Sequence, residues 1–191
     1  MADKKPRIFQ DSRDIILSLL LVVGLMIPTV AFTGMCSFNP GAPENGPVKE
    51  VDAQQILSME AKAMNFPVRL PANPEGWVTN SARRTTVNRQ PATVLGWVTK
   101  EGAYVQLTQT DQPLDKAVQD VDEHGRTQQQ PVEVDGQQFE VYTSADNNVR
   151  DVWATDLGDV RLVFSGTAGA AEFEQIARNT LQATPLPGKS N

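Results

Sequence analysis

The chain has 191 residues, which is enough for one ordinary domain and a short appendage. Its formal net charge is −6; the first 36 residues hold four basic and three acidic side chains, so residues 37–191 carry −7. An acidic body excludes broad binding to nucleic acid, whose phosphates need a basic surface, and the single cysteine excludes an intrachain disulfide.

An uncharged apolar segment begins at Ile15 and ends at the cysteine, Cys36. The 21 residues from Ile15 to Met35 have the length needed to cross a hydrocarbon core of about 30 Å as a helix. Basic residues precede the segment and the first charge after it is Glu44, which predicts a cytoplasmic N-terminus and an extracytoplasmic C-terminal part. The segment is therefore interpreted as a single-pass transmembrane anchor over residues 15–36.

Two other interpretations of this segment stay open. Residues 15–27, its most apolar part, have the length of a signal-peptide core, and Pro28 would then precede a cleavage site. Cys36 stands where a lipoprotein is acylated, although Thr33 and Met35 depart from the residues that such a motif needs.

In a lasting anchor, the small residues Gly24, Ala31 and Gly34 would let another helix approach closely. Pro28 is tolerated there, because the carbonyl that it frees can be satisfied locally. These four positions are the candidates for anchoring and helix contact, and Cys36 is a candidate for attachment of a lipid or a partner chain.

Residues 37–51, with three prolines and two glycines and no periodicity, predict a linker. A helix is expected from the N-cap Asp52 to a point before Pro67. Beyond it the alternation of apolar residues and the turn signals predict further elements in this order: strands over 77–87, 92–100 and 103–110, a short helix over 113–123, two hairpins over 130–144 and 149–166, and a last helix over 169–184.

The order of helix, three strands, helix, four strands and helix predicts an α+β fold with an antiparallel sheet, covered by helices on one face. The predicted domain spans residues 52–184. Residues 1–14 form a cytoplasmic segment before the anchor, and residues 185–191 form a tail.

Side chains of the types that usually act in catalysis or metal binding are scarce in this sequence. His124, the only histidine, stands in the polar stretch "VDEHGR", which predicts an exposed loop rather than a catalytic base. Five carboxylates occur within 13 residues but lack the spacing of a calcium loop, so a solvated helix face is the simpler interpretation. We therefore expect no catalytic, cofactor or metal site and no enzyme. The five are Asp111, Asp115, Asp120, Asp122 and Glu123.

Several stretches carry a family resemblance: "PRIFQDSRDIILSLL", "GMCSFNPG", "VDAQQILSMEAKAMNFPVRLP", "PEGWVTNSARR" and "VWATDLGDVRLVFSGTAG". Together they resemble a family of actinobacterial single-pass membrane proteins of unknown function, with a short basic N-terminus, one helix and a small extracytoplasmic domain. The resemblance covers nearly the whole chain and supplies no catalytic residues. It implies a plasma-membrane protein, and it suggests the respiratory cytochrome bc–oxidase supercomplex as a host.

Two functions follow from these observations. The first is a non-catalytic accessory subunit, whose helix lies in the bilayer beside an integral membrane complex and whose acidic domain packs on the outer face of that complex. The second is a cell-envelope module that binds a lipid, glycan or small molecule. Its cavity would be lined by the aromatic residues Trp77, Trp97, Tyr104 and Trp153.

Overall fold

The computed structural model describes residues 12–32, 48–122, 124–146 and 148–188 of two compact units, Met1–Gly46 and Pro47–Asn191. The first unit contains one helix, α1 (Ser12–Phe32), with Pro28 inside it. Among the described residues, no helix combines the length and the hydropathy of a membrane span. Of the residues singled out for anchoring, Gly24 and Pro28 lie in α1. The side chain of Ala31, and Gly34 and Cys36 as a whole, lie outside the described residues.

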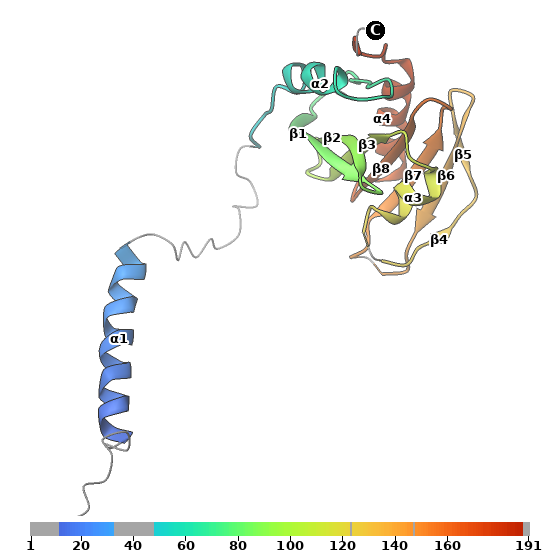
Figure 1. Cartoon of the computed structure of the whole chain (residues 1–191). Helices are drawn as coiled ribbons and strands as arrows, with labels where there is room; N and C mark the ends of the chain where they lie inside the picture. The colour runs from blue at the N-terminus through green and yellow to red at the C-terminus, as the bar shows by residue number, and fades with distance from the viewer. Residues whose placement is uncertain (1–11, 33–47, 123, 147, 189–191) are drawn as a thin grey trace, which may run out of the picture. The chain divides into compact units, whose positions relative to one another are not determined.

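In the second unit, helices are interspersed along the chain with the strands of a sheet (Figure 1). Asp52 is the N-cap of the first helix of this unit, as predicted: its Oδ1 accepts a hydrogen bond of 2.9 Å from the backbone N–H of Gln55. In chain order the elements are α2 (Ala53–Ala61), β1 (Val78–Val87), β2 (Gln90–Val98), β3 (Tyr104–Thr110), α3 (Leu114–Gln119), β4 (Thr127–Gln128), β5 (Val132–Val134), β6 (Gln137–Thr143), β7 (Asp151–Asp156), β8 (Arg161–Gly166) and α4 (Ala170–Gln182).

All strand pairs of the eight-stranded sheet are antiparallel, in the order β1-β2-β3-β8-β7-β6-β4, with β5 also paired to β6. The predicted α+β class and antiparallel sheet are therefore confirmed. The chain leaves the sheet after β3, forms α3 and returns at the far side, so that the last strand, β8, comes to lie between β3 and β7. Strand β4 was not predicted, because two residues are too short to show a periodicity.

Two hairpins turn on residue pairs with positive φ. In the hairpin predicted over residues 130–144, Asp135 and Gly136 have φ of 49° and 82°, as a tight two-residue turn requires. Asn88 and Arg89, with φ of 48° and 64°, connect β1 to β2 in the same way. This second turn was not predicted, because arginine is an unusual residue for a left-handed conformation.

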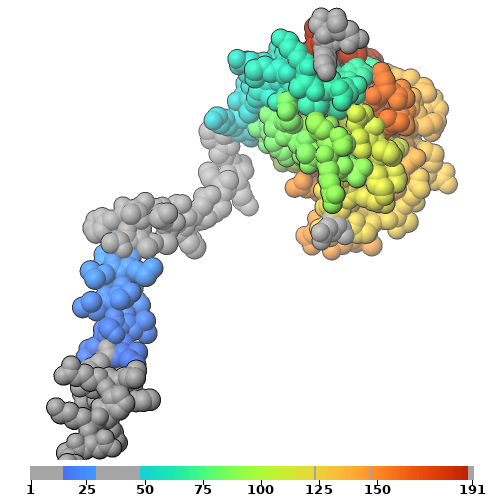
Figure 2. Space-filling model, in the orientation of Figure 1, coloured from blue at the N-terminus to red at the C-terminus, as the bar shows by residue number. Residues whose placement is uncertain are grey.

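The main hydrophobic core lies between one face of the sheet and the helices α2 and α4. Helix α4, which the sequence predicts over residues 169–184, presents an apolar face to this core, with Phe173, Ile176 and Ala177 at most 1% exposed. Figure 2 shows α2 (cyan) as part of the outer layer of this unit, next to β1 and β2 (green). The residues at the centre of this core include Leu57, Trp97, Leu107, Phe139, Leu162, Phe164 and Ile176, each completely buried.

Helix α3 lies on the opposite face of the sheet, which corrects the expectation that helices cover one face only. Its Ala117 packs in a second, smaller cluster with Val152 and Ala154 of β7 and Val163 of β8. Val152 and Ala154 do not share a face with Phe164, because the register pairs Trp153 with Phe164 and so turns its two neighbours to the α3 side. Both faces of these two strands are buried, and alternation along the sequence therefore could not tell one face from the other.

Candidate functional site

The aromatic residues proposed to line a cavity belong mostly to the main core. Trp77, Trp97 and Trp153 are 8%, 0% and 4% exposed, and the ring of Trp153 stacks on Phe173 at a centroid distance of 5.6 Å. The Nε1 of Trp97 donates to Asn73 Oδ1 at 2.8 Å. Among these four residues, only Tyr104 lies on the opposite face of the sheet, in the part of that face that α3 leaves open.

That open part is a polar surface beside α3. Helix α3 covers only the end of the face where Val87, Ala92 and Val163 lie, and the remaining positions carry mostly polar side chains. A cavity of about 250 Å³, here called the arginine-flanked pocket, lies on it and is lined by Arg83, Thr85, Thr86, Val87, Val94, Gln106, Thr108, Ala117, Asp120, Val121, Arg150 and Ser165.

The strand register places the floor of the pocket on four neighbouring strands. Arg83 of β1 pairs with Val94 of β2, which pairs with Thr108 of β3. One step along the strands, Gln106 of β3 pairs with Ser165 of β8. Because cross-strand partners point to the same side of a sheet, these side chains share one face. A third row begins with Tyr104, which precedes Gln106 by two residues on the same face.

Glycine at position 96 makes room for the hydroxyl groups at the edge of this floor. A Cβ built on Gly96 would lie 2.5 Å from the hydroxyl oxygen of Tyr104 and in closer conflict with Ser81 Oγ. The Tyr104 hydroxyl instead lies over the glycine and donates to Gln106 Oε1 at 3.3 Å, while Gln106 Nε2 donates to Thr108 Oγ1 at 3.4 Å. Side chains of β3 thus form a chain of hydrogen bonds along the pocket floor.

The two arginines approach the pocket from opposite sides of the floor. Arg83 belongs to the edge strand β1, and Arg150 immediately precedes β7. The Arg150 guanidinium lies 5.4 Å from the centroid of the Tyr104 ring, a cation–π contact. Neither guanidinium forms an ion pair with a residue that the structure describes.

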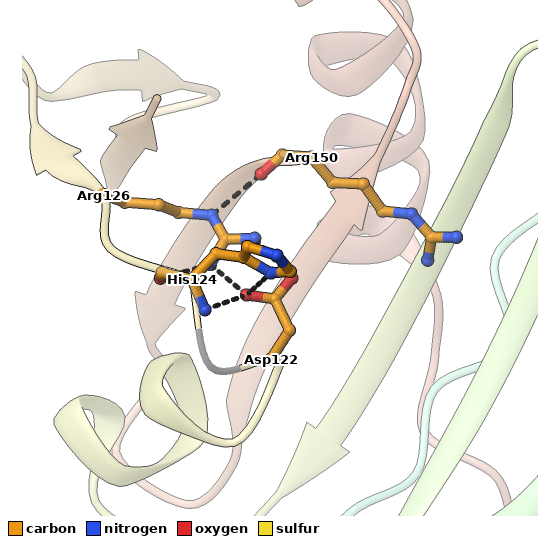
Figure 3. A network of polar contacts seen from close by, with 4 residues as sticks. All are labelled: Asp122, His124, Arg126 and Arg150. Atoms are coloured by element: carbon orange, nitrogen blue, oxygen red, sulfur yellow. Dashed lines mark hydrogen bonds and ion pairs between the residues drawn. The ribbon is translucent and has the colours of Figure 1, made fainter. Parts of the chain in front are cut away.

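A buried arginine fixes the backbone from which Arg150 extends (Figure 3). Arg126, whose side chain is 5% exposed, donates from Nε to the carbonyl oxygen of Arg150 at 2.8 Å. Its two terminal nitrogens donate to the carboxylate of Asp122 at 2.8 and 2.7 Å, in a bidentate pair. Figure 3 shows the Arg150 side chain pointing away from this network, with only its carbonyl turned toward Arg126.

Asp122 completes the network with His124. The backbone N–H of His124 donates to Asp122 Oδ1 at 3.0 Å, and His124 Nδ1 lies 3.3 Å from the same oxygen. The hydrogen bond from Arg126 lowers the pKa of Asp122 from 3.8 to about 2, against the opposing effect of burial. The side chain of His124 is 63% exposed, so the expectation of an exposed loop histidine is confirmed.

We expect the substitution Asp122→Asn to lower the free energy of unfolding by about 1–2 kcal/mol at pH 7, because it leaves buried donors of Arg126 without a charged acceptor. Since the pKa of Asp122 is lowered on folding, this contribution is complete above its unfolded value of 3.8 and is lost as the pH falls toward about 2. Chemical denaturation at a series of pH values measures it.

The matched control is Asp115→Asn, whose carboxylate is 63% exposed and lies 3.7 Å from Lys116 Nζ. An exposed pair of this kind contributes less than about 0.5 kcal/mol. Equal losses for the two variants at pH 7, or a loss for Asp122→Asn that persists unchanged at pH 2, would contradict the assigned ion pair.

Tyr142 lies on the α3 side and packs against the smaller cluster. Burial raises the pKa of its hydroxyl to about 12, and a hydrogen bond that the hydroxyl donates to Glu140 acts in the same direction. The phenol therefore stays protonated at neutral pH and serves as a hydrogen-bond donor in the wall next to α3.

The carboxylates of the acidic segment do not converge. Asp115 is exposed, Asp122 is bound to Arg126, and Asp120 lines the arginine-flanked pocket. Glu123 lies outside the described residues. Within the part of the chain that the structure describes, no three side chains of histidine, cysteine, aspartate or glutamate gather as metal ligands.

The basic stretch around residues 83–84 divides between the two faces of the sheet. Arg84 Nε donates to Glu60 Oε2 of α2 at 2.6 Å, on the side of the main core. Arg83, its neighbour, faces the pocket. The sequence alone could not assign these two arginines to a face, because the face that each residue takes depends on the register of the edge strand.

The fold and the pocket together define a class: a small α+β domain with a polar, arginine-bearing surface on an antiparallel sheet. Residues 7–180 match the family described as "Protein of unknown function (DUF4245)", and the chain belongs to that family. No curated protein and no solved structure matches the chain. The match agrees with the predicted resemblance to a family of unknown function over nearly the whole chain.

Proposed function

We propose that this chain is a single-pass protein of an actinobacterial plasma membrane and a non-catalytic accessory subunit of an integral membrane complex. Helix α1 lies in the bilayer in this proposal, and the acidic unit Pro47–Asn191 lies on the outer face of the membrane. The respiratory cytochrome bc–oxidase supercomplex is the first host to test, as the family resemblance suggests.

The observation that carries the anchor is the apolar surface of α1. Its large apolar side chains between Ile15 and Ile27 are 42–68% exposed. Consecutive residues of a helix point in directions about 100° apart, so this run places apolar side chains on every side. A helix that is apolar all round needs apolar surroundings all round, which a bilayer supplies and a one-sided protein contact does not. The exposed residues are Ile15, Ile16, Leu17, Leu19, Leu20, Leu21, Val22, Val23, Leu25, Met26 and Ile27.

Charged residues in the middle of α1 should release the protein from the membrane. The double substitution Leu20→Arg and Val23→Arg adds about 5–7 kcal/mol to the cost of insertion, at roughly 2.5–3.5 kcal/mol for each charge. We expect the variant to lose most of its membrane-bound fraction after carbonate washing, whereas the unaltered chain stays with the membrane.

Ile15→Arg is the matched control, because a long basic side chain near the end of a span can extend to the interface. It should stay membrane-bound. Full membrane retention of the double variant would contradict a bilayer-embedded helix, as would a mature N-terminus beyond Pro28.

The accessory role is tested by purification through a C-terminal tag in mild detergent. Stoichiometric integral membrane partners are expected to accompany the chain. Recovery of the chain alone, from membranes in which the candidate complexes remain intact, would count against a subunit role.

A second candidate function, an envelope module that binds a small ligand, is favoured by the arginine-flanked pocket. The two guanidinium groups of Arg83 and Arg150 line one cavity without ion-pair partners among the described residues. Native mass spectrometry of the full chain, released from detergent micelles, tests whether a small molecule accompanies the protein.

A further inference from the structure

We propose that the arginine-flanked pocket binds a small polyol that carries a phosphate group. This inference rests on the second candidate function, the ligand-binding module, and names the chemistry of its ligand. It is independent of whether the chain is also a subunit of a larger complex.

The charge at the pocket differs in sign from that of the chain. Residues 37–191 carry a net charge of −7, yet the charged side chains that line the pocket are two arginines and one aspartate. Arg83 extends from β1 and Arg150 from the start of β7, with the floor of β2, β3 and β8 between them. An anionic group on this floor would meet a guanidinium from each side, and guanidinium groups bind phosphate through paired hydrogen bonds.

Contacts within the protein preorganise Arg150 for binding. Its carbonyl is held by the buried Arg126, and its guanidinium lies against the Tyr104 ring at 5.4 Å. A side chain that is already placed loses less conformational entropy on binding.

The rest of the lining fits hydroxyl groups. The carboxylate of Asp120 accepts hydrogen bonds, and the side chains of Gln106 and Ser165 can donate or accept them. A ligand with only an anionic group would leave the Asp120 carboxylate facing a like charge. A ligand that also carries hydroxyl groups would donate to Asp120 at the α3 end while its phosphate lies between the arginines.

The volume limits the size of the ligand. The pocket holds about 250 Å³, and sites for drug-sized ligands usually hold about 300–1,000 Å³. A polyol of a few carbons with one phosphate group fits this space, whether it is a free metabolite or the headgroup of a phospholipid.

The experiment uses the full chain in detergent micelles and titrates three probes: glycerol 3-phosphate, glycerol and inorganic phosphate. Isothermal titration calorimetry should show saturable binding of glycerol 3-phosphate at least about tenfold tighter than of either other probe. A second arm places the full chain in nanodiscs of phosphatidylcholine with or without phosphatidylglycerol. If the headgroup is the ligand, phosphatidylglycerol in the disc should weaken the binding of free glycerol 3-phosphate; if the ligand is a free metabolite, the affinity should stay the same.

Three variants make the test specific. Arg83→Gln and Arg150→Gln should each weaken binding of glycerol 3-phosphate about tenfold or more, the loss expected when a charge-assisted hydrogen bond is removed. Arg84→Gln makes the same change in net charge one residue away but on the opposite face, where Arg84 contacts Glu60. It should bind like the unaltered chain, and circular dichroism should show all three variants folded.

Absence of saturable binding of any phosphate probe would overturn the proposal, and so would equal losses in all three variants. Inorganic phosphate binding as tightly as glycerol 3-phosphate would overturn the assignment of a polyol. A different molecule found by native mass spectrometry, with no binding of the probes, would refute the ligand class and leave the ligand-binding function standing. If the phosphate probes do not bind and native mass spectrometry finds no bound molecule, the ligand class and the ligand-binding function are both refuted.

Discussion

The substitution Gly166→Ala should lower the free energy of unfolding by about 3 kcal/mol or more, the upper range for forcing an extra group into a packed site. Gly166 ends β8 and pairs with Val105 of β3 on one side and with Asp151 of β7 on the other. A Cβ at this position would meet the carbonyl oxygen of Tyr104 well inside contact distance, and would lie 3.0 Å from the Tyr104 carbonyl carbon and from the Val105 Cα.

The neighbouring atoms at Gly166 are backbone, so no side-chain rotation relieves the conflict. Relief requires β3 to move away from β8, which would break the hydrogen bond from the Thr167 N–H to the Tyr104 carbonyl, 2.8 Å long. Because Tyr104 also lies beside the pocket, weaker binding of the proposed phosphate-bearing ligand should accompany the loss of stability. Thermal unfolding, monitored by circular dichroism, measures the loss of stability.

Gly125→Ala is the control for this prediction. A Cβ on Gly125 would have no atom of a described residue within 4 Å, and its φ does not lie in the left-handed region. This substitution should be neutral or slightly stabilising, since alanine lowers the entropy of the unfolded chain. A Gly166→Ala protein as stable as the Gly125→Ala protein would show that β3 and β8 do not pack as closely as described.

Trp97→Ala should also remove about 3–5 kcal/mol from the free energy of unfolding, the range for deleting a large buried aromatic side chain. Trp97 is completely buried in the main core, on the face of β2 opposite the pocket. Its Nε1 donates to Asn73 Oδ1 at 2.8 Å, and the same oxygen accepts from Thr79 Oγ1 at 3.0 Å. The indole therefore fills the core and ties the segment before β1 to the sheet.

Trp97→Phe separates these two contributions. It keeps an aromatic ring in the core and removes the indole N–H, while Thr79 still donates to Asn73, so a loss of only about 1–2 kcal/mol is expected. Urea denaturation, monitored by circular dichroism, measures the free energy of unfolding of both variants. Met59→Ala, at a side chain 59% exposed on α2, should change the stability by less than about 0.5 kcal/mol. Similar losses for Trp97→Ala and Trp97→Phe would show that the hydrogen bond, and not the filled volume, dominates at this site.

Local chemistry in the sequence was enough to predict most elements. Asp52 caps α2 through its own side chain, and Asp135-Gly136 supplies the two positive φ values of a tight hairpin. The apolar face of α4 follows from spacing alone. Each of these features depends on residues close together in the chain, and the same physical chemistry acts on them before and after folding. The uncharged segment from Ile15 to Met35 is likewise a property of sequence, and the anchor inferred from it stays a prediction.

Which side chains share a surface was decided only by the tertiary structure. Adjacent arginines at 83 and 84 face opposite sides of the sheet, and Arg150 reaches the same pocket as Arg83 because β8 and β7 follow β3 in the sheet order. Asp122, which the sequence placed in a solvated acidic run, pairs with the buried Arg126 and so fixes the backbone of Arg150. Composition and spacing describe neighbours along the chain, whereas strand order and register bring together residues that are far apart in it. The pocket consists of such residues, and it therefore exists only in the folded protein.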